Sequence, residues 1–392
     1  MRIAVVVRSL KLGGMERAAV NLAEAFAREG HDAHLIYFKN VQELFPDPAV
    51  GVHRFDLEAQ MRRSPAGLLG QLGARLLNAV MRRSYFYWSG FYLSKLFRRR
   101  LAALEKRTGP FDLIVARGQG TFETLWNLHD PRFVQVVESM FLFPGSALQN
   151  FYLRRLYAHK RIVCVSHGVR ERFLQTADIA GFAPASVDIV TNPVDLETVR
   201  KQAQAYVPDI DGPYILSVGR ITPNKNIPLL IDAYMLLRKR LRTPPKLVIV
   251  GDGHARESVE RKIAELGAQA FVHLTGKLGN PYPWMKHADL FVLSSRFEGL
   301  GMVLIEAMAC GTKVVATDAP GGVSDIMRGE LARFVAAQTP QALAETMQRA
   351  MEAAVPDYSA ALEAFSPAAV VAGWEALSKK PSGNSDASVC GE

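Results

Sequence analysis

Cysteine is scarce in this chain, and long apolar runs are missing. The three cysteines, Cys164, Cys310 and Cys390, are too few and too scattered for a disulfide framework or a zinc site. This scarcity favours a reducing compartment. No stretch reaches the roughly 18 consecutive apolar residues of a membrane-spanning helix, and the first apolar run ends at Arg8, too early for a signal peptide. We therefore expect a cytoplasmic protein that does not span a membrane.

The composition excludes several classes of protein. Apolar residues make up 49% of the 392 residues and charged residues 22%, which excludes a wholly disordered chain, a collagen and a coiled coil. At roughly 100–200 residues per domain, the length indicates two domains. Only the small and polar tail at 379–392 is expected to be disordered.

Acidic residues are nearly absent from residues 61–107. The segment has one acid, Glu105, and a net charge of +10, so the rest of the chain, in a protein of +9 overall, carries only −1. Its eleven basic residues are Arg62, Arg63, Arg75, Arg82, Arg83, Lys95, Arg98, Arg99, Arg100, Lys106 and Arg107. The basic character therefore belongs to one segment of the chain.

The same segment holds an aromatic cluster, which consists of Tyr85, Phe86, Tyr87, Trp88, Phe91, Tyr92 and Phe97. Basic residues around exposed aromatic rings suit an anionic membrane surface, and here we expect the cytoplasmic face of an inner membrane. The alternative is a solvated basic helix whose aromatic side chains pack inward. Nucleic-acid binding is disfavoured, because no recognisable nucleic-acid-binding module accompanies the patch.

Strand and helix signals alternate along both halves of the chain. In the first half, helical spacing appears at 16–29 and across 64–107, and strands are expected at 2–7, 33–38, 112–116, 133–137, 161–165 and 188–190. In the second half, strands are expected at 214–218, 246–250, 271–274, 290–293 and 313–316, and helices at 228–242, 255–266, 284–287, 301–309 and 343–354. Since a parallel strand needs a crossover, the alternation predicts an α/β protein with two Rossmann-like, doubly wound parallel sheets.

The two halves meet at an irregular, proline-containing stretch around 192–213. We expect domains at 1–190 and 213–365, joined by a linker at 191–212. Two such domains facing across a cleft would bring the carboxyl ends of both sheets to one ligand site.

Two glycine-containing turns follow predicted strands. Gly13 and Gly14 open the first helix, where glycine lets the backbone approach a ligand and the helix start offers N–H groups to an anion. An ordinary strand–helix turn explains them equally well. Gly219 and Arg220 follow a second-half strand, and Lys225 comes five residues later. The two cations suit a diphosphate, or they are surface charges of a loop.

Two carboxylates lie eight positions apart near a predicted helix start. Glu298 is on the loop after the strand at 290–293, and Glu306 is one turn inside the next helix. The free N–H groups at 301–303 point to the same place, so the arrangement suits a ligand with sugar hydroxyls and phosphate. The alternative for Glu306 is a partly buried helix residue with a structural partner.

The order and separation of these features are specific. A Gly-Gly-x-Glu helix start is followed by SVGR with a later Lys, by VGDG, by a Glu-x7-Glu pair and by VVATDAPGG. This combination resembles the retaining nucleotide-sugar glycosyltransferases of GT-B fold, the large E-x7-E family 4. The resemblance covers nearly the whole chain, and it is most specific from 214 to 325. It is looser in 1–190, where the family's acceptor binds.

The resemblance implies roles for individual residues. The C-terminal domain would bind the nucleotide sugar, and a last helix at 367–378 would cross back onto the N-terminal domain. Arg220 and Lys225 would neutralise the leaving diphosphate, Glu306 would bind the ribose hydroxyls, and Glu298 would hold the donor sugar's hydroxyls. Other donor contacts would come from Gly13, Gly14, Gly219, Gly299, Leu300, Gly301, Met302 and Val303. The segments 163–173 and 191–195 resemble the family's domain-closing segment.

One position departs from the family pattern. Many members have a histidine after the strand that is expected here at 133–137, where this chain has Glu138. Either Glu138 takes over the contact to the donor sugar, or that contact is absent. His129 precedes the strand and is expected in a loop. Asp209 and Asp211 form an Asp-x-Asp pair, a metal motif of the other glycosyltransferase fold class, but no strand precedes them and a solvated loop is expected.

The sequence thus predicts a metal-independent retaining glycosyltransferase without a cofactor. It would move a hexose or N-acetylhexosamine from a nucleotide sugar, UDP-linked in our expectation, to a glycolipid or oligosaccharide acceptor in lipopolysaccharide core or other surface polysaccharide. One alternative is a GT-B enzyme with a soluble acceptor, similar to a sucrose synthase or a phosphorylase, although such an acceptor needs no membrane patch. The other is a GT-B-like binding protein without catalysis.

Overall fold

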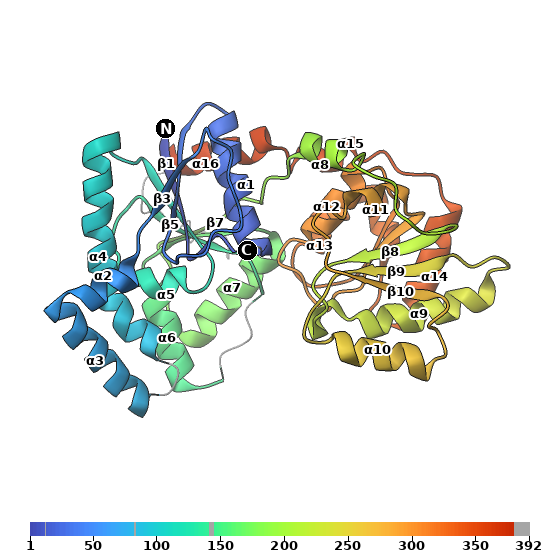
Figure 1. The fold of residues 1–392 in the computed structure, drawn as a ribbon, viewed down its shortest axis with the longest axis horizontal. Helices are drawn as coiled ribbons and strands as arrows, with labels where there is room; N and C mark the ends of the chain where they lie inside the picture. Colours follow the sequence, from blue (N-terminus) through green and yellow to red (C-terminus); the bar gives the residue numbers. More distant parts are fainter. Residues whose placement is uncertain (12, 82–83, 141–144, 380–392) are drawn as a thin grey trace, which may run out of the picture. The chain divides into compact units, whose positions relative to one another are not determined.

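The computed structural model describes residues 1–11, 13–81, 84–140 and 145–379. The described chain forms two compact units, each coloured by sequence in Figure 1. Unit 1 contains Met1–Val165, Val169–Pro193 and the chain from Pro367, and unit 2 contains Ser166–Gly168 and Val194–Ser366. The described residues do not include Arg82, Arg83 or the tail beyond Lys379, to which Cys390 belongs. The predictions made for these residues from the sequence therefore stay predictions.

A seven-stranded parallel sheet forms the centre of unit 1. Its order is β3-β2-β1-β4-β5-β6-β7, and its strands are β1 (Arg2–Val7), β2 (Asp32–Tyr37), β3 (Gly51–Arg54), β4 (Leu113–Arg117), β5 (Phe133–Val137), β6 (Arg161–Cys164) and β7 (Ser186–Ile189). The central strands are continuous runs of buried apolar side chains, because helices cover a parallel sheet on both faces. The edge strand β3 was not predicted, since its sequence GVHR is half-exposed and mostly polar.

The helices of unit 1 include one that arrives from the far end of the sequence. They are α1 (Gly14–Arg28), α2 (Leu57–Arg63), α3 (Pro65–Val80), α4 (Tyr85–Thr108), α5 (Thr121–Leu125), α6 (Ala147–Tyr157), α7 (His167–Ala180), whose first two residues belong to unit 2, and α16 (Pro367–Lys379). The ring of Trp374 on α16 packs edge-on against Phe26 on α1, with 6.2 Å between their centroids. Glu375 pairs with His31 at 3.0 Å. These contacts fix α16 beside α1, as Figure 1 shows.

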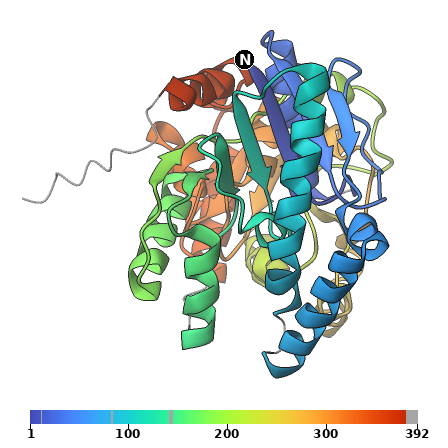
Figure 2. The same cartoon turned by 90° about the vertical axis from the view of Figure 1, so that its left-hand side faces the viewer.

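The segment predicted as one helical stretch over 64–107 is divided. Ser64 ends α2 and caps α3, accepting a hydrogen bond from the N–H of Gly67 at 3.0 Å, and Pro65 then starts the new helix. Phe97 of helix α4 is fully buried and packs edge-on against Phe38, which directly follows β2. Figure 2 shows α4 crossing in front of the sheet. Within the described ranges, no helix has both the length and the apolar character needed to cross a membrane.

Unit 2 is built on a six-stranded parallel sheet with the order β10-β9-β8-β11-β12-β13. Its strands are β8 (Tyr214–Val218), β9 (Lys246–Val250), β10 (Val272–Gly276), β11 (Leu290–Leu293), β12 (Val314–Thr317) and β13 (Val335–Ala336). Its helices are α8 (Leu196–Gln202), α9 (Ile227–Arg240), α10 (Arg256–Glu265), α11 (Tyr282–His287), α12 (Met302–Ala309), α13 (Val323–Ile326), α14 (Pro340–Glu352) and α15 (Ser359–Glu363), with short 3₁₀ turns at Pro223–Lys225 and Gly329–Phe334. The two-residue strand β13 is too short for a sequence pattern to indicate.

The stretch expected to be an irregular linker contains helix α8. Asp195 caps it by accepting a hydrogen bond from the N–H of Thr198 at 3.1 Å. Farther along, the hydroxyl of Tyr206 donates to the carbonyl of Asn280 at 2.6 Å. These contacts place residues 194–212 in unit 2.

Candidate functional site

Two loops of unit 2 carry most of the predicted donor-site residues. The first follows β8 and holds Arg220 and Lys225, and the second follows β11 and holds Ser295 and Glu298. Strands β8 and β11 are parallel neighbours in the sheet. Their carboxyl ends therefore meet, which brings together side chains that are more than 70 positions apart in the sequence.

The centre of this cluster is an ion pair between Lys225 and Glu298. The ammonium nitrogen of Lys225 lies 2.5 Å from Oε1 of Glu298, and the hydroxyl of Ser295 donates to the same oxygen at 2.5 Å. The side chains of Lys225 and Glu298 are 21% and 11% exposed. Within the described residues, Oε2 of Glu298 has no hydrogen-bond partner, so one carboxylate oxygen is held in place and the other is available to a hydroxyl donor.

Further polar contacts hold the two loops together. The side-chain amide of Asn224 donates to the carbonyl of Phe297 at 2.9 Å, and the hydroxyl of Ser294 donates to the carbonyl of Lys225 at 2.8 Å. Asn224, Ser294 and Ser295 were not predicted as site residues from the sequence. The available signal was a pair of serines directly after a buried strand, a position that places hydroxyls at the ligand-binding edge of a parallel sheet.

Arg220 differs from Lys225, because it is exposed and makes no hydrogen bond or ion pair within the described part of the chain. Its loop lies tightly against the end of β9. A Cβ atom on Gly251 would stand 1.9 Å from the carbonyl oxygen of Gly219, and one on Gly253 would stand 2.2 Å from that of Ile221. The VGDG sequence therefore permits a backbone approach that fixes where Arg220 leaves the sheet.

The predicted backbone contacts at 299–303 surround the start of α12. Gly301 has φ of +94°, a conformation that favours glycine, and no side chain caps the helix. The first N–H groups of α12 are thus left to a ligand or solvent. Leu300 is buried, while Gly299, Met302 and Val303 are partly exposed.

Glu306 lies one turn into α12, where the structure gives it a protein partner. The hydroxyl of Tyr282 donates to its Oε1 at 3.3 Å. Burial, together with the charge of Glu306, raises the pKa of the nearby Cys310 thiol to about 12. Burial likewise raises the pKa of Cys164 to about 12, so both thiols stay protonated near neutral pH.

Residues 166–168 pack on the same loops of unit 2. The hydroxyl of Ser166 donates to the carbonyl of Gly299 at 2.7 Å, and the N–H of His167 donates to a carboxylate oxygen of Asp325 at 2.8 Å. A Cβ on Gly168 would come within 2.6 Å of the carbonyl oxygen of Gly321. These contacts join residues 166–168 to the loop at Gly299 and to residues 321–325.

In unit 1, Gly13 and Gly14 begin α1 directly after the loop that follows β1. A carboxylate oxygen of Glu16 would be 2.4 Å from a Cβ on Gly13, so Glu16 folds back over the helix start. A side chain at position 13 would displace that carboxylate. The glycine therefore has a local steric reason besides any contact with a ligand.

Glu138 is paired with Arg117, which was not predicted as a site residue from the sequence. Nε of Arg117 donates to Oε1 of Glu138 at 2.7 Å, and its NH2 group donates to Oδ1 of Asn192 at 2.6 Å. Arg117 is 1% exposed. Burial raises the pKa of Glu138, while the charge of Arg117 opposes that rise. An arginine at the end of the otherwise apolar strand LIVAR was the available signal, because a buried arginine needs acceptors.

Three other predictions concern residues outside these clusters. His129 lies in an exposed loop, with a ring nitrogen 3.1 Å from the carbonyl of Asn127. Asp209 and Asp211 are exposed and have no strand directly before them. Among the residues that the structure describes, no group of three or more His, Cys, Asp or Glu side chains is arranged to hold a metal ion.

Two family models match adjoining parts of the chain. "Glycosyltransferase Family 4" matches residues 12–198, and "Glycosyl transferases group 1" matches residues 199–364. The boundary between the two matches lies within α8.

Curated relatives match mostly over part of their length. The N-acetylgalactosamine-N,N'-diacetylbacillosaminyl-diphospho-undecaprenol 4-alpha-N-acetylgalactosaminyltransferase of Campylobacter jejuni is 35% identical over 46% of this chain and 48% of its own. The GDP-mannose:cellobiosyl-diphosphopolyprenol alpha-mannosyltransferase of Xanthomonas campestris is 25% identical over 82% of this chain and 79% of its own. The chain spans about half the length, or less, of the first curated relatives that it matches.

Solved structures are similar over the whole fold. Anabaena HepE in complex with UDP and glucose superposes with a TM-score of 0.67 at 20% identity, covering 97% of this chain and all of that one. At this identity, the likeness shows the GT-B fold alone. The prediction of two parallel-sheet α/β domains of GT-B type is confirmed.

Proposed function

Because this chain belongs to the family 4 glycosyltransferases, we propose that it moves a hexose or N-acetylhexosamine, with retention of configuration, from a nucleotide sugar to a surface-glycan acceptor. The observation that carries the proposal is the Lys225–Glu298–Ser295 cluster beside Arg220, at the carboxyl ends of β8 and β11. We propose UDP as the nucleotide. HepE, which shares the fold, was solved with UDP and glucose.

Arg220 and Lys225 have different parts in the proposed reaction. Negative charge grows on the diphosphate as the glycosidic bond breaks, and preorganised cations stabilise that charge most in the transition state. Arg220 is exposed and unpaired among the described residues, so it can turn toward the diphosphate without breaking a contact. Lys225 is held by Glu298 and offers its remaining N–H donors to the same group. This pair of cations supplies what a metal ion would otherwise supply, so we propose that neither a metal nor a cofactor is needed.

Glu298 is proposed to orient the donor sugar. Its Oε1 accepts from both Lys225 and Ser295, which locks the carboxylate, and its Oε2 can accept a hydroxyl hydrogen of the sugar. The Lys225–Glu298 contact then links the diphosphate to the sugar across the bond that breaks. The uncapped N–H groups at the start of α12, with the backbone of 299–303, add donors for phosphate.

Two further residues have donor-site roles in the proposal. Glu306 binds the ribose hydroxyls, and its contact with Tyr282 orients the carboxylate. Glu138 holds Arg117 through their ion pair, so we propose that it positions the arginine instead of replacing the family histidine at the sugar. Gly13, Gly14 and Gly219 give backbone access to phosphates.

We also propose that unit 1 binds an anionic membrane surface at the cytoplasmic face, through α3 more than through the aromatic residues of α4. Of the aromatic residues of α4, Phe86 and Phe91 are 44% and 60% exposed, whereas Phe97 is fully buried and Tyr92 shares a 2.7 Å hydrogen bond with Ser64. Helix α3 instead exposes six apolar side chains, which are Leu68, Leu69, Leu72, Leu76, Leu77 and Val80.

The surroundings of α3 support a bilayer as its partner. A mostly apolar cavity of about 420 Å³ lies between α3, α4 and α6, and Trp88, Phe91 and Trp126 are among its lining residues. Arg155 stands at its wall, 6.0 Å from the ring of Trp126, and Arg62, Arg63 and Arg75 flank or belong to α3. Apolar side chains bordered by cations match the chemistry of a bilayer with anionic headgroups. The Campylobacter and Xanthomonas relatives are named for undecaprenol- and polyprenol-linked acceptors.

A donor-hydrolysis and transfer assay tests this function. The protein is incubated with UDP-, GDP- and ADP-linked hexoses and N-acetylhexosamines, with and without a chelator, and release of the nucleoside diphosphate is followed. We expect turnover of a UDP-sugar that survives the chelator, and an α-configured product from an α-linked donor by NMR. A GT-B-like binding protein would release no nucleotide from any donor. Full transfer to a soluble sugar without vesicles would favour the soluble-acceptor alternative.

A further inference from the structure

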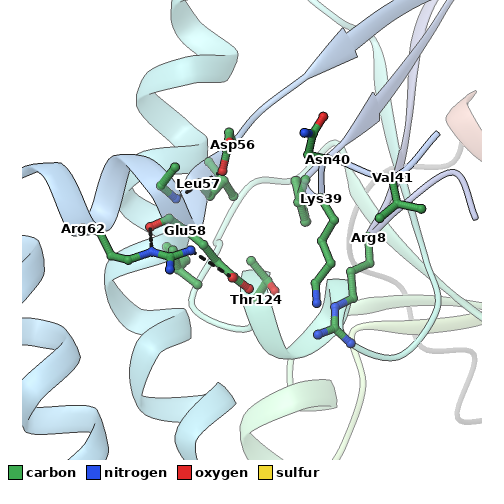
Figure 3. A pocket seen from close by; sticks show the side chains of 12 residues that line it. Arg8, Lys39, Asn40, Val41, Asp56, Leu57, Glu58, Arg62 and Thr124 are labelled. Carbon is green, nitrogen blue, oxygen red and sulfur yellow. Dashed lines mark hydrogen bonds and ion pairs between the residues drawn. The ribbon is translucent and has the colours of Figure 1, made fainter.

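Two cavities of unit 1 share a wall at the carboxyl ends of β1 and β2. The first has a volume of about 300 Å³ and is drawn in Figure 3, and the second has a volume of about 340 Å³. Arg8, Lys39 and Val41 line both. Because the same three residues face both spaces, the cavities adjoin, and the two cations lie where a ligand entering either cavity meets them.

The backbone holds Arg8 and Lys39 next to each other. The N–H groups of Phe38 and Lys39 both donate to the carbonyl of Arg8, at 3.1 and 3.0 Å. Two residues farther on, the N–H of Leu10 donates to the carbonyl of Val41 at 3.1 Å. The loops after β1 and β2 are thus joined, and Figure 3 shows the two basic side chains extending side by side.

Arg8 is packed in place. Its guanidinium carbon lies 5.3 Å from the ring centroid of Phe86. On another side, a Cβ on Gly120 would stand 2.6 Å from Cδ of Arg8, and Gly120 has φ of +87°. Only glycine leaves room there for the arginine stem. The stem of Arg8 is therefore confined by Gly120, and its guanidinium group lies against Phe86.

Neither cation is neutralised by the protein. Arg8 and Lys39 are both half-buried, and within the described ranges neither makes an ion pair or a side-chain hydrogen bond. The two acids of the first cavity are engaged elsewhere: Asp56 caps α2, and Glu58 pairs with Arg62 at 3.9 Å. Glu16 lines the second cavity, folded over Gly13, and Lys11 lines the same cavity, whereas the charge of Arg117 there is balanced by Glu138. The shared wall is left with two uncompensated positive charges.

We propose that Arg8 and Lys39 bind a phosphate or diphosphate group of the acceptor. A guanidinium fork and a point charge held side by side suit phosphate oxygens, and the carboxyl ends of β1 and β2 are where an α/β sheet binds ligands. The inference rests on the proposed function, since it gives the acceptor of that reaction an anionic class. The phosphate comes either from a lipid-linked diphosphate or from a soluble sugar phosphate.

The test begins with binding of inorganic pyrophosphate to the full chain. Arg220→Ala with Lys225→Ala is used as background, which removes the proposed donor clamp. On this background we expect measurable binding by titration calorimetry, and at least a tenfold rise of Kd when Arg8→Gln and Lys39→Gln are added. The control pair Arg28→Gln and Lys201→Gln removes the same charge at exposed positions of α1 and α8 and should leave Kd unchanged. No binding on the background, or equal effects of the two pairs, overturns the proposal.

A second readout separates this site from the donor site. Donor hydrolysis without acceptor should keep its kcat and KM within about twofold in Arg8→Gln/Lys39→Gln, whereas a donor role would raise KM for the nucleotide sugar and contradict the proposal. If the wild-type protein hydrolyses no donor, the proposed function fails while the pyrophosphate result still stands. Arg8→Lys keeps the charge and should retain most of the affinity, which guards against misreading a folding defect.

Competition identifies the source of the phosphate. Bound pyrophosphate is challenged with phosphatidylcholine vesicles that contain undecaprenyl diphosphate, and separately with soluble fructose 6-phosphate. Displacement by the doped vesicles but not by plain phosphatidylcholine vesicles assigns a lipid-linked acceptor. Displacement by the soluble compound assigns a sugar phosphate. Displacement by neither contradicts an acceptor site.

Discussion

The ammonium group of Lys225 and the carboxylate of Glu298 form one ion pair at 2.5 Å, although the residues are 73 positions apart and their proposed ligands are different parts of the donor. The pair is mostly buried, and Ser295 donates to the same carboxylate oxygen. Lys225 and Glu298 therefore act as a coupled pair. A substitution at either residue changes the electrostatic surroundings and the position of the other.

The Lys225–Glu298 pair should be detectable as a coupling between the two residues in the free energy of unfolding. Removing one partner leaves the other charged and poorly solvated, so Lys225→Met and Glu298→Gln should each destabilise unit 2, and the double variant should lose less than their sum. We expect a coupling energy of about 1–2 kcal/mol in urea unfolding, within the range for contacting residues. Additive effects of the two substitutions would mean that the pair does not persist in solution.

Glu306 should affect nucleotide affinity, because its proposed ligand is the ribose, remote from bond breaking. Glu306→Gln keeps the shape but weakens acceptance of hydroxyl hydrogens, so Kd for UDP should rise by about tenfold, the loss of roughly 1.4 kcal/mol that one charge-assisted hydrogen bond supplies. Titration calorimetry measures this. Tyr282→Phe, which removes only the protein partner, should have a smaller effect. Unchanged UDP affinity with reduced stability would give Glu306 a structural role instead.

Membrane binding should depend on α3. Replacing Leu69, Leu72 and Leu76 with serine removes apolar side chains that are 71%, 56% and 62% exposed, so co-sedimentation with anionic vesicles should fall and should fall further in high salt. Serine at Arg98, Arg99 and Arg100 should reduce only the salt-sensitive part. The control triple Leu174→Ser, Ile179→Ser and Leu266→Ser changes exposed apolar residues elsewhere and should bind normally. If the α3 triple sediments like the control, α3 is not the membrane contact.

Lys160 gives a pH dependence that is separate from catalysis. It is 6% exposed, its amine donates to the carbonyl of Leu128, and burial lowers its pKa to about 8. In the unfolded chain the lysine has a pKa near 10.4. Between about pH 8 and pH 10.4 the unfolded chain therefore binds more protons than the folded chain, so stability rises with pH in this range. From pH 8 to 10, wild type should gain about 2–3 kcal/mol relative to Lys160→Met by urea unfolding. Parallel pH profiles would show that Lys160 titrates normally.

Much of the fold could be predicted because its central strands are continuous apolar runs. The sequences RIAVVV and YILSV each carry enough buried β-branched or aliphatic side chains to indicate a parallel strand without tertiary information. The edge strands β3 and β13 could not be predicted, because β3 is mostly polar and β13 has only two residues. Helix α3 was predicted as helical, but its exposed leucines depend on what packs around it.

The residues of the candidate site were indicated by type and order, whereas their contacts were not. Arg220, Lys225 and Glu298 stand after predicted strands, so their position at the ligand-binding edge follows from the rule for parallel sheets. Lys225 contacts Glu298 because β8 and β11 are neighbours in the sheet. The pattern of strands along the sequence does not specify this order. Arg117 was missed for the same reason, because its acceptors Glu138 and Asn192 come from other segments.

Donor-hydrolysis turnover of Arg220→Ala and Lys225→Ala, measured with a saturating nucleotide sugar, tests the central claim most directly. Each change removes a positive charge directed at charge that grows in the transition state, so kcat should fall by about 10²-fold, as for a single oxyanion donor. Arg242→Ala, an exposed arginine beyond α9, should leave turnover unchanged. Near-normal kcat in both site variants would contradict the assignment of these two cations to the leaving diphosphate.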